Sequence, residues 1–283
     1  MCAPDPQSID WKQIELPNTW PDTLKLWRFQ DIKRLWKRVL GKRHRITLPP
    51  ELPGLSSLPA YLLQEFHHLP NGNYSNHIAQ GYTKGFDIAM LGKMKQARRQ
   101  IAKSLLHCHS VLDVGCGGGK LAGTLKALNI PDVWGLDPSP YLLKSAANRY
   151  PRIRFIQGIA ENLPFSTERF DGIGVCFLFH ELPKTIATES LQEFYRVLKP
   201  QGTLAILEPA PEQFYETRFW ELYRLGGLAG IYFSWLAQAV FEPYVLQWHR
   251  CEVKRLLEQS GFSLLSDKRK IPFRFMVAQK RRP

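Results

Sequence analysis

Short apolar runs alternate with helix-length amphipathic segments through the second half of the chain. Seven of these runs have the length and composition of β-strands: residues 110–114, 132–136, 153–157, 170–177, 202–208, 261–266 and 272–279. Helix-length segments separate the first five, which predicts βαβ units and a parallel sheet. The last two lie close together and predict an antiparallel hairpin at one edge. The pattern therefore indicates an α/β fold with a mostly parallel, seven-stranded sheet.

The first half of the chain lacks this alternation. Residues 60–107 have a mostly helical pattern, with helix expected from Tyr61 to Phe66 and from about Tyr74 to Leu106. Before them lies a segment rich in helix breakers, including Pro49, Pro50 and Pro53. These features predict an N-terminal arm and linker over residues 1–59 and one domain over residues 60–283.

The N-terminal arm contains a basic amphipathic helix. Apolar residues recur at helical spacing at Ile32, Leu35, Trp36, Val39 and Leu40, and basic residues fill the opposite side at Arg28, Lys33, Arg34, Lys37 and Arg38. Residues 22–45 hold nine Lys or Arg against two Asp, a net charge of +7. This pattern is typical of a helix at a membrane surface, but a helix that packs its apolar stripe on the domain has the same pattern.

Residues 212–247 interrupt the alternation after the fifth predicted strand. Within them, residues 225–241 contain 17 residues without a charge, diluted by Gly226, Gly227 and Gly230. Such a run is at the lower length limit for a membrane span. We therefore expect an apolar helical lid over the site, either in contact with a bilayer or buried as a helical hairpin.

Composition adds two constraints. The net charge of +13 over 283 residues favours contact with an anionic partner, either nucleic acid or anionic lipid. The five cysteines, Cys2, Cys108, Cys116, Cys176 and Cys251, show neither CxxC pairs nor metal-ligand spacing. This odd, scattered set suggests reduced thiols and a cytoplasmic setting, and the polar N-terminus does not resemble a signal peptide.

A glycine-rich turn follows the first predicted strand. The segment from Val111 to Gly119 reads Val-Leu-Asp-Val-Gly-Cys-Gly-Gly-Gly, and Asp137 ends the next predicted strand. A strand, glycine turn, helix, strand and acid describe half of a nucleotide-binding sheet, in which the acid bonds ribose hydroxyls. A P-loop is excluded because Leu121, and neither Ser nor Thr, follows Lys120. The spacing leaves a dinucleotide-binding or an S-adenosylmethionine (SAM)-binding domain.

Further segments favour SAM. Asp-Val-Gly-Cys-Gly-Gly-Gly resembles the first motif of class I SAM-dependent methyltransferases. Segments 137–140, 158–165, 170–180 and 194–203 resemble, in order, the ubiquinone/menaquinone-biosynthesis type of that Rossmann-like family. Weaker similarity to a subgroup without a well-defined substrate extends to Glu65-Phe-His-His68, Phe179-His-Glu-Leu-Pro183 and Phe241-Glu-Pro-Tyr244, and to segments 72–75, 79–82 and 91–94.

The resemblance implies a set of cofactor contacts. Asp113, Gly115 and Gly117 would hold the methionine end of SAM, and Asp137 the ribose hydroxyls. Pro138 or Ser139 would contact the adenosine edge, and Ala160 and Glu161 would lie by the adenine amino group. The remaining expected contacts are Cys116 in the glycine turn and Phe177 at the fourth strand's end. One departure stands out: Ile159 replaces the acid that the family usually carries after Gly158.

Methyl transfer needs alignment of the acceptor with the sulfonium, and a base only where the acceptor must lose a proton. His180 lies at the exit of the fourth predicted strand, where α/β sheets place ligands, and is the first candidate base together with Glu181. A loop histidine that orders the pocket is the alternative. Tyr74 and Tyr82 could face the sulfonium charge or serve as core aromatics. His67 and His68 lack a third ligand at metal spacing, so we expect no metal.

Together these features predict methyl transfer from SAM to a small, lipophilic acceptor such as a quinone or an isoprenoid, with membrane contact through residues 22–45 and 225–241. RNA or protein methylation is a second hypothesis, which the basic charge permits. However, no Asn-Pro-Pro-Tyr-type motif follows the fourth strand, so nucleic acid is the less favoured partner. The third hypothesis is a non-catalytic, membrane-associated protein that binds SAM.

Overall fold

One seven-stranded sheet forms the centre of the molecule. The computed structural model describes residues 5–7, 9–25, 27–40, 45–54, 58–240 and 242–282, without the side chains of residues 39, 40, 68 and 83. The strands are β1 (Ser110–Val114), β2 (Asp132–Asp137), β3 (Arg154–Gln157), β4 (Phe170–Cys176), β5 (Leu198–Pro209), β6 (Phe262–Lys270) and β7 (Phe273–Lys280). Their order is β3-β2-β1-β4-β5-β7-β6, and only β7 runs antiparallel to its neighbours β5 and β6. The predicted strands and C-terminal hairpin are confirmed.

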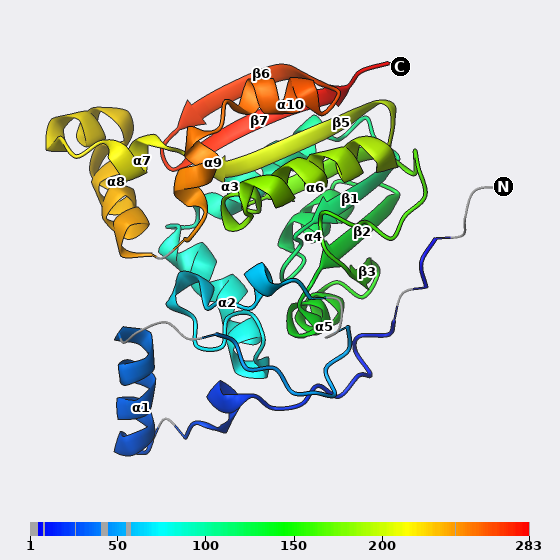
Figure 1. The fold of residues 1–283 in the computed structure, drawn as a ribbon. Helices are drawn as coiled ribbons and strands as arrows, with labels where there is room; N and C mark the ends of the chain where they lie inside the picture. The colour runs from blue at the N-terminus through cyan, green and yellow to red at the C-terminus, as the bar shows by residue number, and fades with distance from the viewer. Residues whose placement is uncertain are drawn as a thin grey trace.

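Helices cover both faces of this sheet (Figure 1). One face packs against α3 (Lys93–Ser104), α4 (Lys120–Ala127) and α5 (Pro140–Arg149), and the other against α6 (Lys184–Val197) and α10 (Val253–Gln259). All five residues of β1 are buried, because strands lie on both sides of it and helices on both faces. The strand order reverses between β1 and β4, which is where open α/β sheets bind ligands.

The expectation of one long helix from Tyr74 to Leu106 is wrong. The structure has α2 (Asn76–Ala89) and α3, separated by a turn in which Leu91 and Gly92 adopt positive φ. Gly92 precedes α3 in the left-handed conformation, which glycine adopts at no steric cost. The helix expected from Tyr61 to Phe66 is also wrong. The helical elements of residues 60–75 are the short 3-10 turns Ala60–Leu62 and Phe66–His68, after which the Ser75 side chain caps α2.

Much of the N-terminal arm packs on the domain. Trp11 is only 1% exposed, and its Nε1 donates a hydrogen bond to the carbonyl of Phe155 on β3. Asp22, in the 3-10 turn Trp20–Thr23, accepts hydrogen bonds from Ser75 Oγ and from backbone N–H groups at the start of α2. The breaker-rich segment also contacts the body, because Gln157 donates to the Pro53 carbonyl.

Helix α1 (Phe29–Leu40) stands apart from the body (Figure 1). Arg38 connects it to the domain through a 3.1 Å ion pair with Glu65. Its described apolar side chains are not buried, and Trp36 is 59% exposed. Packing of the whole apolar stripe on the domain is therefore not observed; the predicted stripe residues Val39 and Leu40 have side chains outside the described set.

The predicted apolar lid is a helical hairpin. After α7 (Glu212–Tyr215), α8 (Phe219–Ala239) breaks at Gly227 and folds back, so a Cβ at Gly230 would lie 2.3 Å from the Leu222 carbonyl oxygen. The hairpin projects from one end of the sheet (Figure 1) and precedes α9 (Val245–Arg250). No described helix is both long and apolar enough to cross a membrane. Phe241, expected at the end of the lid, lies outside the described residues.

The burial of Trp11 predicts that the start of the chain stabilises the domain. Trp11→Ala should lower the free energy of unfolding by about 3–5 kcal/mol, because it leaves a cavity and an unpaired Phe155 carbonyl. Trp36→Ala, at an exposed position, should change it by less than about 0.5 kcal/mol. Urea denaturation of both variants measures the difference, and equal losses would contradict this packing.

Candidate functional site

The glycine turn lies at the switch point between β1 and β4. Gly115, Gly117 and Gly119 all have positive φ, between +51° and +74°. A Cβ at Gly117 would meet nothing within 4 Å, so this backbone faces open space in which a ligand can approach. A Cβ at Gly119 would lie 2.9 Å from the Phe155 ring, so this glycine lets the start of α4 pack closely against the sheet.

Asp137 ties the end of β2 to the glycine turn. Its two carboxylate oxygens accept hydrogen bonds from the N–H groups of Gly117 (2.8 Å) and Ser139 (2.9 Å). Burial raises the pKa of Asp137 to about 6, against the lowering effect of these bonds. Ser139 also caps α5, as its sequence position suggested, by accepting from Leu142 N–H.

Asp113 lies at the end of β1, behind the glycine turn. One carboxylate oxygen accepts from Ala122 N–H at 2.8 Å, which fixes the first turn of α4. The other oxygen is buried without a hydrogen-bond partner in the described part of the chain. Burial raises the pKa of Asp113 to about 8, so this environment favours either a proton or a nearby cation.

Most of the predicted site residues line one pocket beside this turn. Ten of the site residues predicted from the sequence line this pocket: Tyr74, Asp113, Gly115, Cys116, Gly117, Asp137, Pro138, Ser139, Phe177 and Glu181. Ala160, Glu161 and His180 do not line it. Ala160 belongs to the core on the α6 side, and Glu161 accepts a hydrogen bond from Tyr61.

Three buried polar atoms around this pocket lack a protein partner. Besides the Asp113 oxygen, they are the Asn73 side-chain oxygen and the Tyr74 hydroxyl, counted within the described residues. Buried polar groups are nearly always paired, so three in one pocket indicate a polar ligand there. A ligand with an ammonium group and sugar hydroxyls fits this donor and acceptor set.

A row of aromatic rings separates this pocket from a second cavity. Along it, His67 stacks on Tyr82, Tyr82 on Phe86, and the edge of Phe86 meets Phe177, with ring centroids 5.6–6.0 Å apart. Tyr82, Phe86 and Phe177 line both cavities, so the two adjoin across this row. Phe177 has a φ of 63°, which is strained for a bulky residue and turns the chain sharply after β4.

The second cavity, of about 360 Å³, is mostly apolar. The lid residues Phe233, Leu236, Ala237 and Val240 form part of its wall. Phe233 is 2% exposed, whereas Trp235 is 64% exposed and is absent from the lining. Of the neighbouring lid aromatics Phe233 and Trp235, only Phe233 faces the cavity.

The exit of β4 is organised by the buried carboxylate of Glu208, on β5. It accepts hydrogen bonds from the backbone N–H groups of Leu178, Phe179 and His180, and lies 2.6 Å from His180 Nδ1. This fixes the 3-10 turn Phe179–Glu181 and the orientation of the His180 ring.

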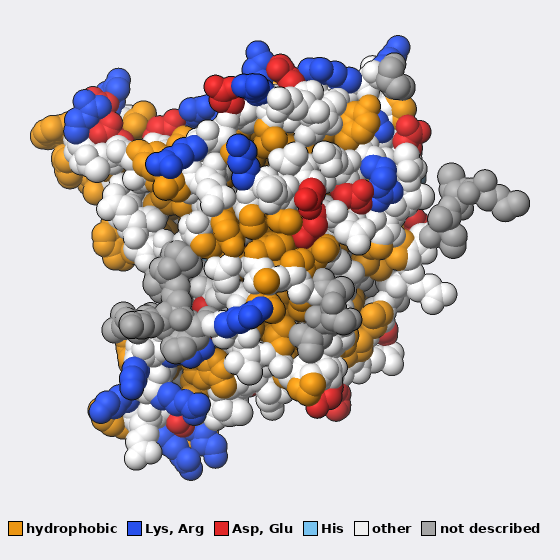
Figure 2. Space-filling view, in the orientation of Figure 1, with side chains coloured by type: hydrophobic (Ala, Val, Ile, Leu, Met, Phe, Trp, Pro, Cys, Tyr) orange, Lys and Arg blue, Asp and Glu red, His pale blue; other side chains and the backbone are white. Residues whose placement is uncertain are grey.

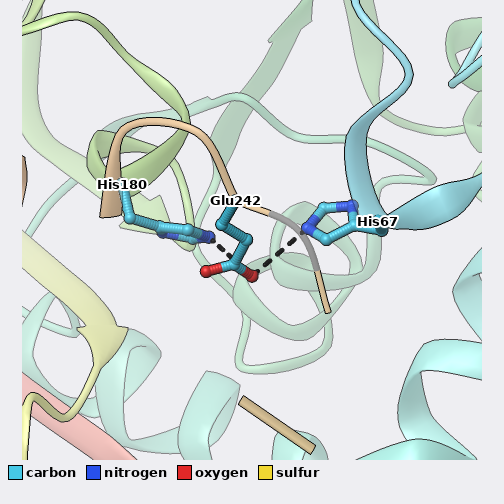
Figure 3. A group of neighbouring side chains, drawn as sticks. All are labelled: His67, His180 and Glu242. Carbon is cyan, nitrogen blue, oxygen red and sulfur yellow. Dashed lines mark ion pairs between the residues drawn. The ribbon is translucent and has the colours of Figure 1, made fainter. Parts of the chain in front are cut away.

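Glu242 lies between two histidines (Figure 3). Its Oε1 is 3.5 Å from the Nε2 atoms of both His67 and His180. His67 Nε2 is also 3.3 Å from Glu181, which lines the pocket beside the glycine turn. Burial alone would lower the pKa of His180, but the carboxylates of Glu242 and Glu208 raise it well above its ordinary value. Burial raises the pKa of Glu181.

Several residues of the site were not predicted from the sequence. Glu208 and Glu242 contribute the carboxylates around His180, and Phe86 contributes to the aromatic row. Arg98 and Asp87 also line the first pocket, and form a bidentate ion pair with both N–O distances at 3.0 Å. None belongs to a recognisable local motif for these roles; only Glu242 fell within a segment noted for family resemblance.

Two segments of the molecule expose large apolar side chains, and one of them, α8, also lines the second cavity. On α8, Trp220 and Leu228 are each 76% exposed, and Arg218 and Arg224 lie on the same projecting hairpin. On α1, Trp27 and Phe29 at its start are about four-fifths exposed, at 80% and 79%. Figure 2 shows hydrophobic side chains beside Lys and Arg at the projecting hairpin, and Lys and Arg gathered over α1.

Comparisons with known proteins identify the family of this domain. A family of methyltransferase domains matches residues 111–202. A demethylmenaquinone methyltransferase from Chlorobaculum parvum is 31% identical over 174 residues, which are 59% of this chain and 70% of the relative. One from Thermotoga maritima is 35% identical over 140 residues, 48% of this chain and 60% of the relative. Several other relatives are matched over about half their length, such as 46% for an uncharacterized methyltransferase from Synechocystis.

Solved structures share the fold. The PH0226 protein from Pyrococcus horikoshii has a TM-score of 0.50 and 18% identity, over 66% of this chain and 91% of that one. Human N-acetylserotonin methyltransferase, solved in complex with SAM, has a TM-score of 0.53 and 16% identity over 74% of this chain and 57% of that one. The expected Rossmann-like fold is thereby confirmed.

Proposed function

Because the chain belongs to the class I SAM-dependent methyltransferases of the ubiquinone/menaquinone-biosynthesis kind, we propose that it methylates a small, lipophilic acceptor held in the cavity under α8. The observation that supports this acceptor is the apolar cavity, which adjoins the glycine-turn pocket across Tyr82, Phe86 and Phe177. A sugar or nucleotide would leave its polar groups unpaired against such a wall.

Different pocket residues would bind different parts of the cofactor. Bound SAM supplies a methyl group on a positively charged sulfur. Asp113, with its unpaired oxygen, would bind the amino group of the methionine part, and the backbone of Gly115 and Gly117 would lie along it. Asp137 retains lone pairs for ribose hydroxyls beyond its two backbone bonds. Arg98 and Lys120, both of which form ion pairs with Asp87, also line the pocket and would offset the charge of the cofactor's carboxylate.

Glu181 is the better candidate base of the two expected. It lines the cofactor pocket, and its raised pKa brings a carboxylate closer to neutral pH. His180 lies outside that lining, and its Nδ1 is engaged by the buried Glu208 carboxylate. In the reaction, an acceptor atom attacks the methyl carbon, the carbon–sulfur bond breaks with its electrons passing to sulfur, and the acceptor proton passes to Glu181.

The acceptor reaches the site from an anionic membrane surface. Lid residues both line the acceptor cavity, as Phe233 does, and expose apolar groups to solvent, as Trp220 and Leu228 do. Exposed aromatic residues beside Lys and Arg suit the lipid interface, and the net charge of +7 over residues 22–45 suits anionic headgroups. On this proposal the protein works in the cytoplasm, on the membrane surface.

Loss of the Asp137 carboxylate should weaken cofactor binding. Asp137→Ala removes the acceptor of two ribose hydroxyl bonds and loosens the glycine turn, so the affinity for S-adenosylhomocysteine should fall about 30–150-fold. Asp132→Ala, at the opposite end of β2, should leave it within about threefold. Calorimetric titration measures both, and unchanged binding by Asp137→Ala would contradict the assignment.

The two lid aromatics offer a matched test of the acceptor wall. Phe233→Ser should reduce methyl transfer to a lipophilic quinone precursor at least about tenfold, because it puts a hydroxyl into an apolar wall. Trp235→Ser, three-fifths exposed and outside the cavity, should leave the rate within about twofold. Both should bind S-adenosylhomocysteine like the unchanged protein; equal rates for the two variants would exclude this wall.

Membrane contact depends on exposed side chains that the fold itself does not need. Trp220→Ser with Leu228→Ser should weaken binding to phosphatidylglycerol vesicles at least about tenfold, because each side chain loses its burial in lipid. Leu106→Ser with Leu265→Ser, exposed elsewhere, serves as the control. Sedimentation with vesicles measures binding; if the lid pair binds like the control pair, α8 does not contact lipid.

A further inference from the structure

We propose that His67, His180 and Glu242 bind a divalent transition-metal ion, with Zn²⁺ as the reference case, beside the acceptor cavity. Ligand atoms of the three side chains all lie within 4.8 Å of one another (Figure 3). Two histidines and one glutamate are a set that zinc enzymes use when a further coordination position stays open. The role of this metal in catalysis rests on the proposed methyl transfer, whereas the metal site itself does not depend on it.

Two of the three separations between ligand atoms suit a shared metal ion better than direct hydrogen bonds. Glu242 Oε1 lies 3.5 Å from both histidine Nε2 atoms, longer than a good N–H···O bond. Metal–ligand distances of about 2.0–2.2 Å in a tetrahedron set neighbouring ligand atoms roughly 3.3–3.6 Å apart. His180 Nε2 and the second oxygen of Glu242 are buried and have no hydrogen-bond partner among the described residues.

The surroundings of His180 match those of a metal-binding histidine. Its Nδ1 lies 2.6 Å from the buried Glu208 carboxylate, which orients the ring and directs Nε2 toward Glu242. Such a carboxylate–histidine pair is the usual support for a metal ligand. Three carboxylates, Glu181, Glu208 and Glu242, surround the two histidines, and a divalent cation offsets their charge.

Three distant segments bring these ligands together. His67, His180 and Glu242 belong, in turn, to Glu65-Phe-His-His68, Phe179-His-Glu-Leu-Pro183 and Phe241-Glu-Pro-Tyr244, and the sequence alone predicted a metal site in none of them. The backbone of His67 is held in the left-handed region, at φ 54° and ψ 24°. The expectation of no metal considered only ligands close in sequence, whereas here the third ligand comes from a different element.

The site faces the acceptor cavity, which His67 and Glu242 line. An open coordination position there would take an anionic oxygen, so the geometry favours an acceptor with a phenolic or enolic hydroxyl. Glu181, 3.3 Å from His67 Nε2, is placed to accept the hydroxyl proton. The metal is neither oxidised nor reduced, and the methyl group passes to the acceptor as described above.

Tag-free protein, stripped with a chelator and dialysed, should bind one Zn²⁺ per chain in competition with a fluorescent indicator. His67→Gln and Glu242→Gln should each weaken this binding at least about 100-fold, since each removes one of three ligands. His77→Ala, an exposed histidine at the rim of the same cavity, should bind Zn²⁺ within twofold of the unchanged protein.

S-adenosylhomocysteine binding within threefold for every variant shows that each is folded. Unchanged protein that binds no stoichiometric Zn²⁺, or ligand variants that bind it like His77→Ala, would overturn the metal site and leave the residues as an ion-pair cluster. Failure of the unchanged protein to bind S-adenosylhomocysteine would instead refute the proposed function, so the two failures are distinguishable.

Discussion

The buried carboxylate of Glu208 is the interaction on which the rest of the site depends. A charge so far from water is costly unless it is fully hydrogen-bonded and paired. Glu208 meets that requirement with three backbone N–H groups and the His180 ring. In doing so it fixes the turn after β4, from which Phe177 joins the aromatic row and Glu181 reaches the pocket beside the glycine turn.

Because Phe177 follows β4 in this turn, two chemically different cavities adjoin at the aromatic row. On one side, glycine backbone, Asp113 and Asp137 offer a polar surface; on the other, Phe233 and its neighbours on α8 offer an apolar one. Tyr82, Phe86 and Phe177 line both cavities, so a methyl donor and an acceptor would have to meet at these rings. The α8 hairpin, which forms the lid, extends from the apolar cavity to the molecular surface.

Local sequence patterns were sufficient for the sheet and the glycine turn. Each strand is a short apolar run, and Ser139 is a capping residue directly before a helix, so each signal lies within a few residues. The break between α2 and α3 was missed because the helical periodicity continues across Gly92. Trp11, Glu208 and Glu242 owe their roles to partners far along the chain, which no local pattern reveals.

The central claim is methyl transfer from SAM to a lipophilic acceptor. Its most direct test is incubation of the purified protein with methyl-labelled SAM and separated lipid, RNA and protein fractions of a cell extract. We expect label to enter the lipid fraction, where organic solvent extracts it, and this labelling to be lost in the Asp137→Ala variant. Label found only in RNA or only in protein would contradict it.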